Sequence, residues 1–317
     1  MLDKVVEEYI KIEDSANNSL DSLIEAVHSN DVKTVEKILK TGVNPNHVWI
    51  GDTNKEENIL ILAIKMSRLQ IVKLLLQYGA YPHITNSNGY TPIHFAVKQA
   101  NVEILEELLN KAVIYVGKRF LGMYIKHAIV ISSPVDVLNI LLREISLINN
   151  SSDVIDTYIT ISKPTPVLTY AIYTYQYENT QLLIEHNAYV NISDPISGRT
   201  PLMAALALSN VDASLKFSKL LLSAGSDVNA LDFNRITPLH IAIDRPNASL
   251  EVIKLLLEFG AYQTINHENL LGSTALTLAI DYNRPEVVKL LMDFGATLDS
   301  VHPKYRKLKS ILRKNHA

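Results

Sequence analysis

The sequence predicts an all-α protein in which about eight helix-turn-helix units stack side by side, with long β-turns or hairpin fingers between them. Three observations predict this architecture. Apolar runs of helical spacing come in pairs along most of the 317 residues. Many of the second runs end at Gly or Gly-Ala, as helices commonly do. An alanine recurs at one place in each first helix, 32 to 43 residues apart: Ala26, Ala63, Ala96, Ala128, Ala171, Ala205, Ala242 and Ala279.

The clearest unit lies between Gly225 and Ala261. Its first helix is expected to begin at Thr237-Pro238, because Thr can cap unpaired N–H groups and Pro suits the first helical position. Residues 252–257 form a second helix that is too apolar to stand alone. Each unit must therefore pack against its neighbours.

Two segments of this unit, 237–242 (TPLHIA) and 225–230 (GSDVNA), resemble the ankyrin repeat. Similar hexapeptides stand at 91–96 (TPIHFA), 200–205 (TPLMAA) and 274–279 (TALTLA). The resemblance implies a solenoid whose concave face, made of turn tips and first helices, binds another protein. It also implies that His94 and His240 link neighbouring turns, so neither histidine is predicted to be catalytic.

The predicted repeat array covers residues 20–296, and an acidic segment at 1–19 is expected to cap its first repeat. The first repeat has Asp21-Ser22 in place of Thr-Pro, and Asp can still cap the helix. A long connection from 44 to 57 carries Trp49, which either anchors a partner or folds back onto the core.

The array is expected to be irregular around residues 113–165. A polar insertion with a β-branched stretch occupies 146–164, and Thr165-Pro166 stands one residue out of frame with the repeat that follows. A shifted turn should absorb this difference. Residues 297–317 are predicted to form a basic capping helix, and binding to an anionic membrane is the alternative.

Composition excludes several classes of protein. Thirty basic and 33 acidic residues give a formal net charge of −3, which argues against a surface built for nucleic acid. The absence of cysteine excludes disulfides, thiolate catalysis and cysteine-based zinc sites. No apolar run is long enough to cross a bilayer, and the N-terminus lacks a secretory pattern. We therefore expect a monomeric cytoplasmic protein without membrane insertion.

No pattern of catalytic residues stands out. The histidines lack the paired spacing of a helical metal site. Gly117 and Gly122 have the spacing of a phosphate loop, but Met123-Tyr124 stands where Lys-Ser/Thr is required. The sequence therefore predicts no enzymatic activity, no cofactor and no metal.

The residues that flank each hexapeptide are expected to be exposed on the binding face, among them Ile196, Leu208, Leu270 and Leu271. Aromatic and Arg side chains contribute most strongly to protein interfaces. The predicted protein-binding residues are Trp49, Tyr90, Lys98, Tyr173, Arg199, Phe233, Arg245 and Tyr282. Tyr173 has the alternative of packing under the irregular insertion.

Irregular repeats, frequent Asn, Ile, Tyr and Lys, and the segment 74–80 (LLLQYGA) resemble ankyrin proteins of poxviruses or intracellular bacteria. This resemblance implies a host-interaction factor that binds and sequesters or inhibits an intracellular host protein, such as a signalling or ubiquitin-ligase component. A substrate-recruiting adaptor for a ubiquitin ligase and a passive assembly scaffold are the alternatives. Many poxvirus members end in an F-box-like segment, and residues 297–317 hold at most a short basic helix.

Overall fold

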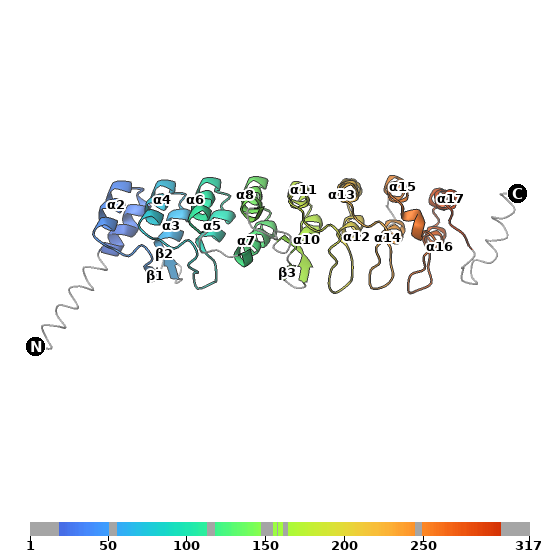
Figure 1. Ribbon diagram of the computed structural model, residues 1–317, viewed down its shortest axis with the longest axis horizontal. Coiled ribbons are helices and arrows are strands. Elements are labelled where there is room, and N and C mark those ends of the chain that lie inside the picture. The colour runs from blue at the N-terminus through green and yellow to red at the C-terminus, as the bar shows by residue number, and fades with distance from the viewer. Residues whose placement is uncertain are drawn as a thin grey trace, which may run out of the picture. The chain divides into compact units, whose positions relative to one another are not determined.

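The computed structural model describes residues 19–50, 56–112, 118–146, 155–156, 158–160, 164–244 and 249–298. It separates the chain into two compact units, Met1–Val154 (unit 1) and Ile155–Ala317 (unit 2). Within each unit, helices pair and the pairs stand side by side (Figure 1). The predicted all-α repeat architecture is confirmed, because the described residues hold eight helix pairs and two short strand pairs.

Unit 1 has four helix pairs and one strand pair among its described residues. The helical residues 19–28 pair with α2 (Val32–Lys40). The other pairs are α3 (Ile59–Lys65) with α4 (Leu69–Gln77), α5 (Pro92–Lys98) with α6 (Val102–Ala112), and α7 (Lys118–Val130) with α8 (Val135–Ser146). Strands β1 (Val48–Ile50) and β2 (Glu56–Asn58) run antiparallel ahead of α3, with Trp49 opposite Glu57.

Unit 2 also has four helix pairs in the part of it that the structure describes. They are α10 (Val167–Tyr173) with α11 (Tyr177–Glu185), α12 (Pro201–Leu206) with α13 (Val211–Ser223), α14 (Pro238–Asp244) with α15 (Leu250–Glu258), and α16 (Ala275–Asp281) with α17 (Pro285–Asp293). A 3-10 turn, η1 (Ala261–Thr264), follows α15. Strands β3 (Tyr158–Thr160) and β4 (Pro164–Pro166) pair antiparallel. The out-of-frame Thr165-Pro166 belongs to β4, so α10 begins only at Val167.

The helices of each unit form two layers. In unit 1, α5 packs between α3 and α7, while α6 packs between α4 and α8. Unit 2 repeats this order, with α14 between α12 and α16 and α15 between α13 and α17. The turns that precede the first helices, here called fingers, project beyond the first-helix layer (Figure 1). Burial of apolar residues such as Ile64, Ile93 and Ile253 between the layers supplies the main stabilisation.

The same backbone hydrogen bond recurs at six of the repeated alanine positions. The carbonyl of Ala63 accepts the N–H of Arg68 at 2.9 Å, and the carbonyl of Ala279 accepts the N–H of Arg284 at 2.9 Å. The same bond occurs at Ala26, Ala96, Ala128 and Ala171. It closes a turn in which the residue before the donor has a positive φ, for example 55° at Ser67. At these six positions the bond marks the end of the first helix and the turn into the second.

Caps at the first helices explain the Thr-Pro hexapeptide. The side chain of Thr237 lies 2.7 Å from Nδ1 of His240, and Nε2 of His240 lies 3.1 Å from the carbonyl of Ser273 in the next finger. Because a carbonyl can only accept, Nε2 donates and Nδ1 is the acceptor. The implied linking role of His240 is confirmed. His94 instead meets the next repeat through ring contacts with Tyr124 and His127.

Asparagine side chains bridge consecutive repeats at the other end of the finger. Nδ2 of Asn46 donates to the carbonyl of Gly79 at 2.9 Å, and its Oδ1 accepts the N–H of Tyr81 at 2.7 Å. In unit 2, Asn191 makes the equivalent pair of bonds with Gly225 and Asp227. These bonds help to hold neighbouring fingers in register.

Candidate functional site

Three fingers of unit 2, those before α12, α14 and α16, are each closed by one Asp or Asn side chain. In the finger before α14, Oδ1 of Asp232 accepts the N–H groups of Asn234 and Ile236, both at 2.9 Å. Asp194 closes the finger before α12 in the same manner, and Asn269 closes the finger before α16. These bonds satisfy backbone donors locally and define the shape of each tip.

Neighbouring fingers of unit 2 are joined backbone to backbone. The N–H of Phe233 donates to the carbonyl of Ser197 at 2.9 Å, and the N–H of Leu270 donates to the carbonyl of Asn234 at 3.1 Å. Phe233 also packs on Gly198, where an added methyl group would stand 2.5 Å from the ring and 2.9 Å from the backbone nitrogen. Gly198 has a φ of +76°, so only glycine fits here without strain. The tips are therefore held side by side.

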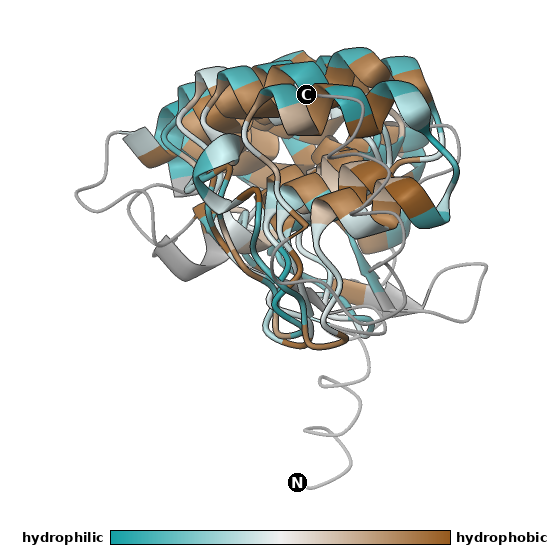
Figure 2. Cartoon of the chain, turned by 90° about the vertical axis from the view of Figure 1, so that its right-hand side faces the viewer, coloured by the Kyte–Doolittle hydropathy of each residue, from teal (hydrophilic) through white to brown (hydrophobic). Residues whose placement is uncertain are grey.

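Large apolar side chains are exposed on these tips. Their exposed fractions are 52 % for Ile196, 63 % for Phe233, 63 % for Leu270 and 87 % for Leu271. Figure 2 shows hydrophobic segments at the ends of the fingers, away from the helices. We call these four residues the fingertip row. Exposed apolar residues gathered on a rigid support are typical of a protein-binding surface.

Two of the predicted anchors of unit 2 also join neighbouring repeats. Nε of Arg199 lies 3.5 Å from Oδ2 of Asp232, whose side chain is almost completely buried. The hydroxyl of Tyr282 donates a hydrogen bond to Asp244 in the preceding repeat. This hydrogen bond raises the pKa of the Tyr282 phenol. Both side chains therefore have a structural task in addition to any contact with a partner.

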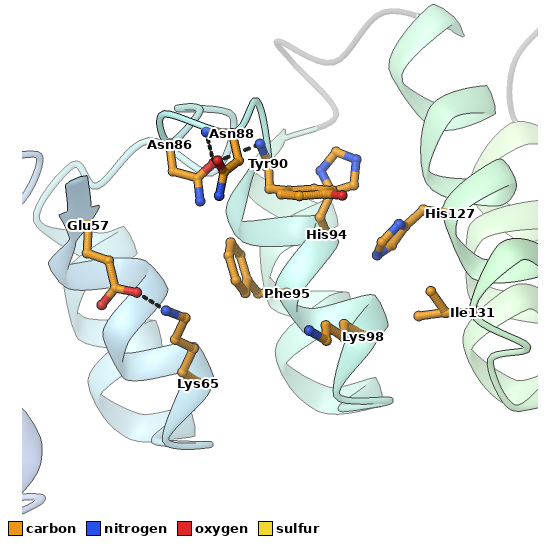
Figure 3. A pocket seen from close by; sticks show the side chains of 10 residues that line it. All are labelled: Glu57, Lys65, Asn86, Asn88, Tyr90, His94, Phe95, Lys98, His127 and Ile131. Carbon is orange, nitrogen blue, oxygen red and sulfur yellow. Dashed lines mark hydrogen bonds and ion pairs between the residues drawn. The ribbon is translucent and has the colours of Figure 1, made fainter. Parts of the chain in front are cut away.

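Unit 1 contains a pocket of about 440 Å³ beside α5, which we call the α5 pocket (Figure 3). The side chains come from β2, α3, the finger before α5, α5 itself and the end of α7. They are Glu57, Lys65, Asn86, Asn88, Tyr90, His94, Phe95, Lys98, His127 and Ile131. The pocket thus spans three consecutive repeats.

Aromatic rings form one wall of the α5 pocket. The ring of Tyr90 lies 5.3 Å from that of His94 and 5.8 Å from that of His127, and the two imidazoles are 5.1 Å apart. Phe95 lies between Tyr90 and Lys98 in Figure 3. Nζ of Lys65 stands 5.1 Å from the Phe95 ring centroid and forms an ion pair with Glu57. Three ring types and a paired lysine therefore surround the cavity.

The two histidines of the pocket are neutral at neutral pH. Burial, with a smaller contribution from nearby His127, lowers the pKa of His94 to about 4. Its Nδ1 accepts the backbone N–H of Thr91 at 3.1 Å, which leaves the ring proton on Nε2. Burial also lowers the pKa of His127, as does the charge of Lys98.

Lys98 supplies the unbalanced charge of the α5 pocket. Its side chain is exposed, and no carboxylate among the described residues lies within 4.0 Å of its ammonium group. Lys65 is already neutralised by Glu57. With both histidines neutral, the pocket carries one positive charge at neutral pH.

The structure places the predicted binding residues in several surroundings. Tyr90 and Lys98 come together in the α5 pocket, Phe233 belongs to the fingertip row, and Tyr173 is 43 % exposed at the end of α10. Trp49 lies in β1, but its side chain and the whole of Arg245 fall outside the described residues, as do residues 1–18 and 299–317. The prediction that Leu208 is exposed is wrong, because only 8 % of it is accessible and it lies in the core.

Sequence reasoning did not select Phe95, His127 or the amides Asn86 and Asn88 as parts of one site. One signal existed, since His94 and His127 stand one repeat length apart. The recurring alanines nevertheless place His127 at the position that Phe95 holds in the preceding repeat, so the facing of the two imidazole rings depends on how the repeats stack.

In the described part of the chain, no group of three or more His, Cys, Asp or Glu side chains is arranged to hold a metal ion. Across the same residues, the helices are too short or too polar for any of them to traverse a bilayer.

Comparisons with known proteins agree with this geometry. The family described as ankyrin repeats (3 copies) matches residues 5–119 and 206–301, which together make up more than half of the chain. The chain therefore belongs to the ankyrin repeat family, and ankyrin repeats are protein–protein interaction modules.

Relatives of known sequence come from viruses and from animals. An ankyrin repeat protein of fowlpox virus (strain NVSL) is 31 % identical over 96 residues, which cover 30 % of this chain and 12 % of that protein. A second from the same virus is 33 % identical over 104 residues, or 32 % of this chain and 29 % of that protein. The nuclear factor NF-kappa-B p105 subunit of Gallus gallus is 27 % identical over 206 residues, or 63 % of this chain and 20 % of that protein. The chain spans less than a third of the length of each.

Proposed function

We propose that this protein is a viral host-interaction factor that binds an intracellular host protein through the fingers and first helices of unit 2 and thereby sequesters or inhibits it. The fingertip row is the observation that carries this proposal. The similarity to fowlpox virus proteins supports a viral origin, and the proposal places the action of the protein in the host cytoplasm.

Rigidity makes the fingertip row suitable for binding. The finger backbones are already bonded to each other through Phe233 and Leu270, so little conformational entropy remains to be lost when a partner binds. Leu271 and Phe233 expose most of their surface, and burial of such side chains supplies the dominant favourable contribution to association. A partner with a complementary apolar patch is therefore expected.

Affinity purification from avian cells tests the proposal, because two of the relatives belong to a fowlpox virus. The wild-type chain and a Phe233→Ala/Leu271→Ala variant would be compared by quantitative mass spectrometry. Both side chains are mostly exposed, so the fold should persist in the variant. We expect at least one abundant host protein to be recovered by the wild type and lost by the variant.

A matched control is Tyr81→Ala, which removes a 53 % exposed aromatic residue from unit 1, outside the fingertip row. This control should retain the host protein. Identical partner sets for the wild type and the fingertip variant would contradict the proposal, and so would equal losses in the fingertip and control variants. Direct binding of the purified host protein, with inhibition of its activity, then separates sequestration from simple contact.

A further inference from the structure

The α5 pocket is chemically unlike the fingertip row and does not depend on it. Its walls combine the rings of Tyr90 and Phe95 with one unbalanced ammonium group on Lys98. We propose that the α5 pocket binds an acidic segment of a partner protein, with an Asp or Glu carboxylate on Lys98 and an adjacent apolar side chain against Tyr90 and Phe95.

The unbalanced charge of the pocket determines which charge a bound ligand should carry. Lys65 already has Glu57 as its counter-ion, whereas Lys98 has no carboxylate partner among the described residues. Neutral histidines add no positive charge. A cationic segment would meet Lys98 with like charge, while a carboxylate would neutralise it.

An unsatisfied donor or acceptor lies beside Lys98. Nε2 of His127 is buried without a hydrogen-bond partner, although the ring lines the pocket and points toward Tyr90 and His94 in Figure 3. A buried polar atom of this kind costs free energy until a partner arrives. A carboxylate held by Lys98 would offer oxygen atoms to the protonated form of this nitrogen.

The remaining walls suit a polypeptide. Oδ1 of Asn86 is occupied by the N–H groups of Asn88 and Tyr90, but its NH₂ group has no partner among the described residues. Asn88 is exposed at the same edge of the pocket. Side-chain amides can pair with the N–H and C=O groups of a peptide backbone. A cavity of about 440 Å³ that spans three repeats has room for more than one side chain of such a segment.

The probe is a random peptide library displayed on phage and selected on the immobilised whole chain. We expect enriched peptides to carry Asp or Glu next to an aromatic or aliphatic residue. The strongest peptide, labelled with fluorescein, would then be titrated by fluorescence anisotropy against the wild type, Lys98→Ala and Lys98→Glu. Loss of the ammonium group should weaken binding about fivefold, and reversal of its charge should weaken it about twentyfold.

Lys111→Ala is the matched control, since Lys111 is an exposed lysine on α6 of the same repeat and lies outside the pocket. The affinity of the Lys111→Ala variant for the labelled peptide should equal that of the wild type. Lys98 is exposed, so its variants should fold, and circular dichroism would verify this. The Phe233→Ala/Leu271→Ala variant should also bind the peptide normally, which separates this inference from the function proposed for unit 2.

Three results would overturn the proposal. They are enrichment of peptides without acidic residues, an affinity that Lys98→Ala leaves unchanged, and the absence of any enriched peptide. In the last case, stabilisation of the chain by benzoate in a thermal-shift assay would assign the pocket to a small aromatic anion instead.

Discussion

The described fingers of units 1 and 2 belong to repeats of the same type, but they present different surfaces. In unit 2, Phe233 packs on Gly198 and backbone hydrogen bonds join one tip to the next. In unit 1, the finger at Asn86–Tyr90 closes on itself, and a pocket lies beside it. The stacked fingers of unit 2 present exposed apolar tips, whereas the finger at Asn86–Tyr90 borders a cavity that is walled by aromatic rings and a lysine.

The sharpest test of this comparison is Gly198→Ala against Gly89→Ala. Both glycines have a positive φ, +76° and +77°, but only the methyl group at position 198 would overlap Phe233. We expect Gly198→Ala to lower the free energy of unfolding by about 3 kcal/mol, from backbone strain and overpacking together. Gly89→Ala should cost only about 1 kcal/mol, from strain alone.

Urea unfolding of the whole chain would measure these two changes, with hydrogen exchange resolved by peptide to separate the units. Equal losses in the two variants would show that finger stacking does not distinguish unit 2 from unit 1.

A second test uses pH. The pKa of His94 is about 4, below its ordinary value of 6.5, so the unfolded chain takes up the proton first as pH falls. Neutral His94 makes its full contribution to the free energy of unfolding above pH 6.5. This contribution decreases as the pH falls toward 4, by about 3 kcal/mol in total. His94→Asn keeps an acceptor for Thr91 but removes the titration, so its unfolding free energy should fall less over this range.

His240→Asn provides the comparison from unit 2. Burial also lowers the pKa of His240, but its hydrogen bond to Ser273 opposes the shift. This variant should therefore change the pH dependence less than His94→Asn does. An equal or larger effect at His240 would contradict the difference in surroundings described for the two rings.

Asp232→Ala against Asn86→Ala tests the closure of the fingers. Asp232 is buried, accepts two backbone N–H groups and lies next to Arg199, whereas Asn86 accepts two N–H groups at a more exposed site. We expect losses of about 2–3 kcal/mol for Asp232→Ala and about 1 kcal/mol for Asn86→Ala. Thermal and urea unfolding measure both losses, and a larger loss for Asn86→Ala would contradict the greater stabilisation expected from the buried Asp232 carboxylate.

The smallest effects are expected from removing single tyrosine hydroxyls, and Tyr282→Phe is the larger of the two. This change removes the hydrogen bond to Asp244 at an exposed position, so it should cost about 0.5–1 kcal/mol. Tyr90→Phe should be nearly neutral for stability, because the contacts seen for Tyr90 in unit 1 involve its ring. Urea unfolding of both variants measures the difference, and a clear loss in Tyr90→Phe would reveal a role for its hydroxyl.

Local sequence determined the repeat by itself. The spacing of Ala63, Ala96 and Ala242, the Thr-Pro starts and the terminal glycines predict eight helix pairs, because caps and helical periodicity act within a few residues of one another. The exposure of Phe233 and Leu271 also followed from their places beside the hexapeptides.

Tertiary structure alone decided which residues of different repeats meet. His94 faces His127 and Phe233 covers Gly198, while Leu208 turned out to be buried instead of exposed. These pairs are about one repeat apart in sequence, and their meeting depends on the packing between repeats. Local propensity carries no information about that packing, which is why the repeats could be recognised from the sequence and the α5 pocket could not.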